Sequence, residues 1–147
     1  PAQPGVAELL ALEDARGLSR PDTFRRFFDT VQQRKQELTA LLQRFKAEGK
    51  RIAAFGAPAK ATTLLCHFGL GPDVLDYIID ESPWKQGRYS PGSHLPVVPS
   101  AWLYDEHRPD IVLILAWNFA ESIIQKHRAF QEAGGRFVIP LPHVEVR

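Results

Sequence analysis

The feature that most constrains the fold is the run Ile111–Leu115, in which five apolar residues follow one another without interruption. A strand that is apolar on both faces is typical of the centre of a parallel sheet covered by helices on both sides. The other expected strands are Ile52–Phe55, Val74–Ile79, Val97–Val98 and Phe137–Ile139. Strands and helical stretches that alternate at this spacing predict an α/β fold, with a Rossmann-like, mostly parallel sheet and helices on both faces.

The segments between these runs have the composition of helices. Residues 59–68 are expected to form the first, which ends near Gly69. A short helix is expected from Ser100 to Tyr104, and a longer one from Phe119 to Ala133. Cys66 and His67 fall within the first of these helices, where we expect them to serve packing rather than chemistry.

A different period governs the first part of the chain. Apolar residues recur there at helical spacing, which predicts a short helix around Val6–Leu12 and a long one that begins near Pro21 and ends at Gly49. We therefore divide the chain into an N-terminal helical extension, residues 1–49, and a Rossmann-like domain, residues 50–147.

Composition excludes several classes of protein. The chain has 147 residues and a single cysteine, Cys66, which excludes a disulfide framework and a multi-cysteine zinc site; the five histidines show no metal spacing either. The net charge of +1 gives no argument for nucleic acid, and no apolar run approaches the ~20 residues of a membrane helix. We expect a cytoplasmic protein with no metal, nucleic acid or membrane partner. A chain that starts at Pro1 without a methionine is expected to be part of a longer polypeptide.

In an open parallel sheet, ligands bind beyond the carboxyl ends of the strands. The first expected strand ends at Gly56 and is followed by Ala57, Pro58 and Lys60. A glycine turn that leads into a helix offers free backbone N–H groups to an anion, and Thr62 and Thr63 add hydroxyls. The alternative is that Gly56 and Pro58 only shape a tight turn. The segment is not a dinucleotide fingerprint, because two of the three required glycines are missing.

The second strand is followed by an acidic residue and a basic loop. Asp80 lies 24 residues after Gly56, where nucleotide-binding sheets place a carboxylate on a ribose hydroxyl. It could equally cap a turn or pair with Lys85 or Arg88. Arg88 can grip phosphate and Tyr89 offers a flat face, although a solvated loop would also contain basic residues.

Several segments, in order, carry a resemblance to a known family. They are Phe55–Lys60 with Thr62–Leu65, Lys85–Arg88 with Pro91–Gly92, Leu113–Asn118, and Gly134–Pro140. The first resembles the GAPAKGNTLL signature of the C-terminal domain of the sugar C-methyltransferases, which depend on S-adenosylmethionine and methylate a ring carbon of nucleotide-linked deoxysugars. The resemblance covers about residues 20–142. Ala61 and Thr62 depart from the signature, where the family has Gly and Asn, so the sugar could differ.

The resemblance implies an enzyme of three parts. A cysteine-rich zinc module and a middle domain that binds S-adenosylmethionine and supplies the base would precede this domain, which would help to enclose the nucleotide-sugar. We therefore expect no catalytic residue and no cofactor in this chain, with the methyl-donor domain as its partner; the helical extension could also serve self-association. The residues expected to bind the substrate are Gly56, Ala57, Pro58, Lys60, Thr62, Thr63, Asp80, Arg88, Tyr89, Trp117 and Asn118. The alternatives are a non-catalytic module for NAD or coenzyme A and a structural docking domain.

Overall fold

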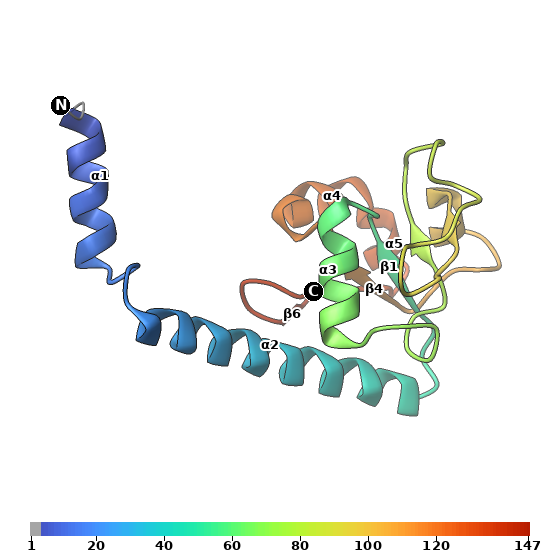
Figure 1. Cartoon of the computed structure of the whole chain (residues 1–147). Helices are drawn as coiled ribbons and strands as arrows, with labels where there is room; N and C mark the ends of the chain where they lie inside the picture. Colours follow the sequence, from blue (N-terminus) through green and yellow to red (C-terminus); the bar gives the residue numbers. More distant parts are fainter. Residues whose placement is uncertain (1–3) are drawn as a thin grey trace. The chain divides into compact units, whose positions relative to one another are not determined.

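The computed structural model describes residues 4–147 (Figure 1). The chain divides into two compact units, which meet between Gln33 and Arg34. This boundary lies inside the long helix α2 (Pro21–Ala47), so a single helix contributes to both units. The division of the chain at residue 49 stays a prediction.

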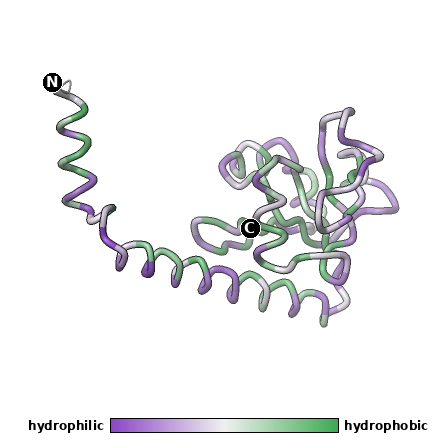
Figure 2. The backbone as a smooth tube through the Cα atoms, in the orientation of Figure 1, coloured by the Kyte–Doolittle hydropathy of each residue, from purple (hydrophilic) through white to green (hydrophobic). Residues whose placement is uncertain are grey.

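The first unit contains α1 (Pro4–Ala15) and the first part of α2. Apolar and polar residues are interspersed along both helices, as Figure 2 shows. Leu9 and Leu10 on α1 and Phe24 and Phe27 on α2 are all more than half exposed. The two helices predicted at the N-terminus are therefore present, but these four apolar side chains are not packed into a core.

The second unit is built on one six-stranded sheet, in the order β3-β2-β1-β4-β5-β6. Its strands are β1 (Ile52–Phe55), β2 (Ile78–Ile79), β3 (Val97–Val98), β4 (Ile111–Ile114), β5 (Arg136–Ile139) and β6 (Glu145–Val146). All neighbours pair in parallel except β5 and β6, which are antiparallel. The chain first moves outward from β1 to β3 and then returns to β4 on the other side of β1, so the strand order reverses between β1 and β4. The predicted mostly parallel, Rossmann-like sheet is confirmed.

Helices cover both faces of this sheet, as predicted. One face packs against the 3₁₀ helix η1 (Ser100–Leu103) and the pair α4 (Ala120–Lys126) and α5 (Arg128–Glu132), with Phe130 fully buried among strand residues. The other face is covered by α3 (Ala59–Phe68) and the second part of α2, which buries Leu38, Leu42 and Phe45. Alternate strand residues serve the two faces, because successive side chains of a strand point to opposite sides.

Three sequence-based expectations need correction. The strand predicted over Val74–Ile79 is reduced to its last two residues, because Val74 and Leu75 donate their N–H groups to Gly71 in a turn. The helix predicted over Phe119–Ala133 is interrupted at His127 and begins with a 3₁₀ turn, η2 (Trp117–Phe119). Strand β6 has no apolar run and was not predicted; it exists through its pairing with β5.

Cys66 and His67 fall within α3, as predicted. Both residues are exposed, so neither is part of the buried core. They lie on the outer surface of α3, whereas Leu64, Leu65 and Phe68 on the same helix are buried.

Candidate functional site

The loops that follow β1 and β4 meet where the strand order reverses, at the edge of the sheet where the parallel strands end, which we call the carboxyl edge. Gly56 has φ +88°, and a Cβ atom placed on it would lie 3.0 Å from the Cβ of Ala116. A side chain at position 56 would therefore require both a strained backbone and a wider gap between the two loops. Gly56 forms a tight turn, which agrees with both interpretations that the sequence left open, and it lets the backbone after β1 reach the loop after β4.

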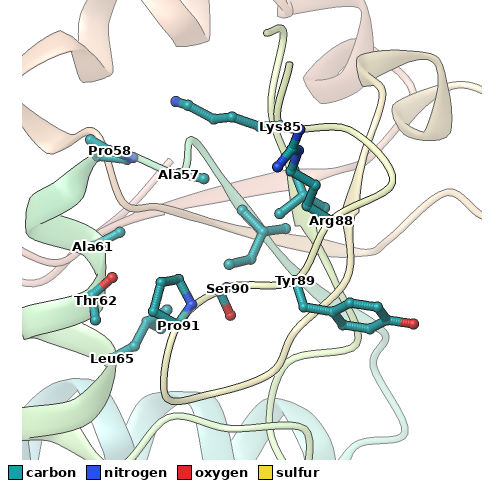
Figure 3. Close-up of a pocket in the computed structure, with 12 residues that line it drawn as sticks. Ala57, Pro58, Ala61, Thr62, Leu65, Lys85, Arg88, Tyr89, Ser90 and Pro91 are labelled. Atoms are coloured by element: carbon teal, nitrogen blue, oxygen red, sulfur yellow. The ribbon is translucent and has the colours of Figure 1, made fainter. Parts of the chain in front are cut away.

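A cleft of about 230 Å³ lies between α3 and the loop that follows β2 (Figure 3). Its lining residues are Ala57, Pro58, Ala61, Thr62, Leu65, Ile78, Lys85, Arg88, Tyr89, Ser90, Pro91 and Val97. Its floor is aliphatic, with Ile78 and Val97 from the sheet and Leu65 from α3. The charged groups are Lys85 and Arg88, which lie across from α3, while the Tyr89 ring extends away from α3 and is 68% exposed. The cleft thus joins an apolar floor to a cationic rim.

The Asp80 carboxylate connects the turn after β1 to the loop after β2, both of which contribute residues to the cleft. It accepts the backbone N–H of Ala57 at 2.7 Å and that of Ser82 at 2.9 Å, and it pairs with Lys85 Nζ at 3.1 Å. Burial by itself would raise the pKa of Asp80, but the two backbone hydrogen bonds and the Lys85 ammonium outweigh it, so the pKa lies below its usual value. The pairing with Lys85 that the sequence left open is present, and the carboxylate fixes one cleft residue on each side.

A second group of predicted residues lies at the starts of the helices after β1 and β4. Lys60 Nζ donates to Asn118 Oδ1 and lies 4.0 Å from the centre of the Trp117 indole. A cation over an indole face is a favourable contact, and the amide oxygen holds its position. None of these three side chains lines the cleft, but Lys60 is two residues from Pro58, which does.

The predicted site residues therefore fall into four groups, with Thr63 outside all of them. Ala57, Pro58, Thr62, Arg88 and Tyr89 line the cleft, and Asp80 supports it. Gly56 shapes the turn beside it, and Lys60, Trp117 and Asn118 form the neighbouring group. Thr63 is exposed on α3 and belongs to none of these groups. The role of each residue in binding stays a prediction.

Sequence reasoning selected neither Lys85 nor five apolar residues of the cleft, which are Ala61, Leu65, Ile78, Pro91 and Val97. Lys85 lies in a basic loop, and only the structure shows that the Asp80 carboxylate holds the Lys85 ammonium in place. Ala61 and Leu65 are four residues apart, a spacing that puts residues on one side of a helix. That pattern could have predicted an apolar wall, although it is equally typical of a packed core.

Within residues 4–147, three or more His, Cys, Asp or Glu side chains nowhere gather closely enough to hold a metal ion. Among the described helices, none has the length and apolar composition needed to cross a membrane.

Comparison with known proteins supplies the family. The C-methyltransferase C-terminal domain family matches residues 1–142. The C-methyltransferase NovU of Streptomyces niveus is 37% identical over 147 residues, which cover 98% of this chain and 34% of that protein. The chain therefore spans about a third of the length of this curated relative. Because the family match extends over nearly the whole chain, the chain belongs to the C-methyltransferase C-terminal domain family.

Proposed function

We propose that this domain binds a nucleotide-sugar for a C-methyltransferase that transfers a methyl group from S-adenosylmethionine to a sugar carbon, and that it has no catalytic activity alone. The observation that carries the proposal is the cleft, an aliphatic floor with Lys85 and Arg88 at its rim. It lies at the carboxyl edge of a parallel sheet, where such folds bind their ligands.

The chemistry of the cleft suits a nucleoside diphosphate. An aliphatic floor formed by Leu65, Ile78 and Val97 accepts the flat, weakly polar surface of a base. Lys85 and Arg88 supply the positive charge that a diphosphate needs, and an arginine can hold phosphate oxygens with two parallel hydrogen bonds. Tyr89 is mostly exposed, and its ring would have to turn toward α3 to cover a bound ligand.

The group formed by Lys60, Trp117 and Asn118 suits the sugar. An amide and an ammonium are hydrogen-bonding partners for sugar hydroxyls, and an indole face packs against the C–H groups of a sugar ring. This assignment extends the nucleotide-sugar from the cleft toward the point where the strand order reverses, and Lys60→Ala tests it.

The methyl donor is assigned to the rest of the enzyme. S-adenosylmethionine carries a cationic sulfonium, which Lys85 and Arg88 would repel, so the cleft does not fit it and the methyl-transfer step is not assigned to this domain. Trp84 and Phe119 are 83% and 61% exposed in the segments after β2 and β4. Exposed aromatic residues are enriched at protein interfaces, which supports docking of the methyl-donor domain at this edge. A cytoplasmic location and self-association stay predictions.

Calorimetry of the 147-residue chain tests the proposal. A thymidine-diphosphate sugar, NAD and coenzyme A are titrated separately, and the nucleotide-sugar is expected to bind most tightly. Lys85→Ala and Arg88→Ala should each weaken binding about tenfold, which corresponds to one charge-assisted hydrogen bond. Arg44→Ala, an exposed cation on α2 outside the cleft, is the matched control and should leave affinity unchanged.

Each alternative function has its own result. Preferred binding of NAD or coenzyme A would replace the proposal with a general nucleotide module. No binding of any of the three, with no effect of the variants, would favour a structural docking domain. Methyl transfer by the isolated chain with S-adenosylmethionine would contradict the assignment of catalysis to the rest of the enzyme.

A further inference from the structure

The buried side chain of His127 lies next to the segment that forms the cleft, yet the proposed binding role does not use it. His127 is 4% exposed and stands at the break between α4 and α5. Its ring lies 5.0 Å from the ring of Phe55, the last residue of β1. A polar ring placed this deeply needs a partner for each nitrogen, since an unsatisfied buried polar atom is costly.

The two ring nitrogens face different groups. Nδ1 lies 2.9 Å from the hydroxyl of Tyr104, and Nε2 lies 3.5 Å from Glu81 Oε1 and has no hydrogen-bond partner within residues 4–147. A carboxylate can only accept, so the neutral ring places its proton on Nε2, toward Glu81, and Nδ1 accepts from Tyr104. The imidazole is therefore one short movement away from a hydrogen bond with Glu81.

Glu81 is shared between His127 and a lysine. The same oxygen, Oε1, lies 2.6 Å from Lys126 Nζ. Glu81, Lys126 and Tyr104 are thus the titratable groups that face the imidazole, from the segment after β2, from α4 and from the segment after η1. Protonation of the ring would attract Glu81 and repel Lys126, which changes the balance between the two contacts.

The backbone carries this change to the cleft. Glu81 directly follows Asp80, whose carboxylate holds the N–H groups of Ala57 and Ser82 and the ammonium of Lys85. Ala57 and Lys85 line opposite sides of the cleft. A displacement of Glu81 toward His127 would therefore pull on the residue that fixes both walls.

We propose that His127 is a positioning residue for the cleft, which acts through Glu81 on the Asp80–Lys85 segment, and that protonation of its ring weakens nucleotide-sugar binding. The ligand half of this statement rests on the proposed function, whereas the coupling between His127 and the segment does not. Burial lowers the pKa of His127, and the neighbouring Lys126 charge lowers it further, while Glu81 raises it. The lowered pKa favours the neutral ring in the folded protein.

Nuclear magnetic resonance of the free chain tests the coupling without any ligand. The imidazole signals of His127 and the amide signals of Ala57 and Ser82 are followed from pH 8 to pH 5. The amide shifts should change with the midpoint of the His127 ring. In Glu81→Gln the ring should still titrate, but the amides should no longer follow it. Amides that stay constant through the ring titration in the unmodified protein would overturn the proposal.

Binding measurements test the effect on the cleft. A thymidine-diphosphate sugar is the probe, because its phosphates carry no ionisation in this pH range. Between pH 7.5 and 5.5 its affinity should fall about fivefold, a magnitude typical of coupled sites, and His127→Gln should abolish the change. His107→Gln, at a histidine outside the cleft, is the matched control and should keep it. If the amides of Ala57 and Ser82 follow the His127 titration but no nucleotide-sugar binds, the positioning role stands and the proposed function fails. If the nucleotide-sugar binds with the same affinity at pH 7.5 and pH 5.5, the proposed effect of His127 on the cleft is overturned.

Discussion

Replacement of Asp80 by asparagine tests whether the contacts of this carboxylate stabilise the candidate site, a role that we call the brace. Asp80 is 7% exposed and accepts two backbone hydrogen bonds, from Ala57 at 2.7 Å and from Ser82 at 2.9 Å. Asparagine keeps one acceptor oxygen and turns an NH₂ group toward the second N–H. One of the two backbone donors would therefore lose its partner, and the ion pair with Lys85 would be lost as well.

The magnitude follows from these contacts. A hydrogen bond to a charged group contributes about 1.5–3 kcal/mol, and Lys85, whose side chain is 44% exposed, adds at most about 1 kcal/mol as an ion pair. We expect Asp80→Asn to lower the free energy of unfolding by about 3 kcal/mol at pH 7. Urea unfolding, followed by circular dichroism, measures this difference. Asp76→Asn is the control, because its contacts are longer, 3.5 Å to Lys46 and 3.3 Å to a backbone N–H, and it should cost less than about 1 kcal/mol.

The dependence on pH provides a second check. The pKa of Asp80 is lower in the folded protein than in the unfolded chain, because hydrogen bonds outweigh the effect of burial. Its contribution is therefore complete above the unfolded pKa of about 4 and is lost as the pH falls through the lower folded value. The difference between Asp80→Asn and the unmodified protein should narrow below pH 4. A difference under about 0.5 kcal/mol at pH 7 would refute the role of Asp80 as a brace.

Three further outcomes are expected. Gly135→Ala places a methyl group against the Phe130 ring, so it should lower the free energy of unfolding, measured in urea, by about 1–3 kcal/mol. The double variant with Phe130→Leu should recover part of this loss. If the free-energy changes of the two single variants simply add, the methyl group and the ring do not overlap. Burial lowers the pKa of His127, so the stability of the unmodified protein should fall as the pH drops below about 6.5, the pKa of histidine in the unfolded chain. The urea midpoint of His127→Gln should fall less over the same pH range. An equal fall in the variant and the unmodified protein would contradict this prediction. Lys60→Ala should cost less than about 1 kcal/mol but change Trp117 fluorescence, and an unchanged spectrum would deny the cation–π contact.

The elements that the sequence located most accurately are those bounded by clear local signals. Strand β1 and helix α3 have the predicted limits, because an apolar run ends at a glycine and a helical pattern ends at Gly69 in the left-handed conformation. Strands β2 and β6 have two residues each, and their existence depends on pairing with neighbouring strands. The equally short β3 was predicted because it consists of two valines, whereas Glu145 and Val146 of β6 form no apolar run.

The candidate site shows the same division. The carboxyl edge of the sheet, the glycine turn at Gly56 and the basic loop around Arg88 follow from residue types in order along the chain. The contact between Asp80 and Ala57 and the one between His127 and Glu81 join residues far apart in the sequence. Nothing in the composition of either segment marks the partner, because each carboxylate could equally be a solvated turn residue.

By itself, the sequence determined the α/β class, the mostly parallel character of the sheet and the family resemblance. Each of these depends on the order of residues along the chain, through hydrophobic period, turn residues and motif spacing. Only the tertiary structure decided that the cleft lies between α3 and the loop after β2. It also decided that Lys60, Trp117 and Asn118 form a separate group outside the cleft. The reason is physical: a cleft is the space left when distant segments pack, and its shape depends on long-range contacts that no local pattern records.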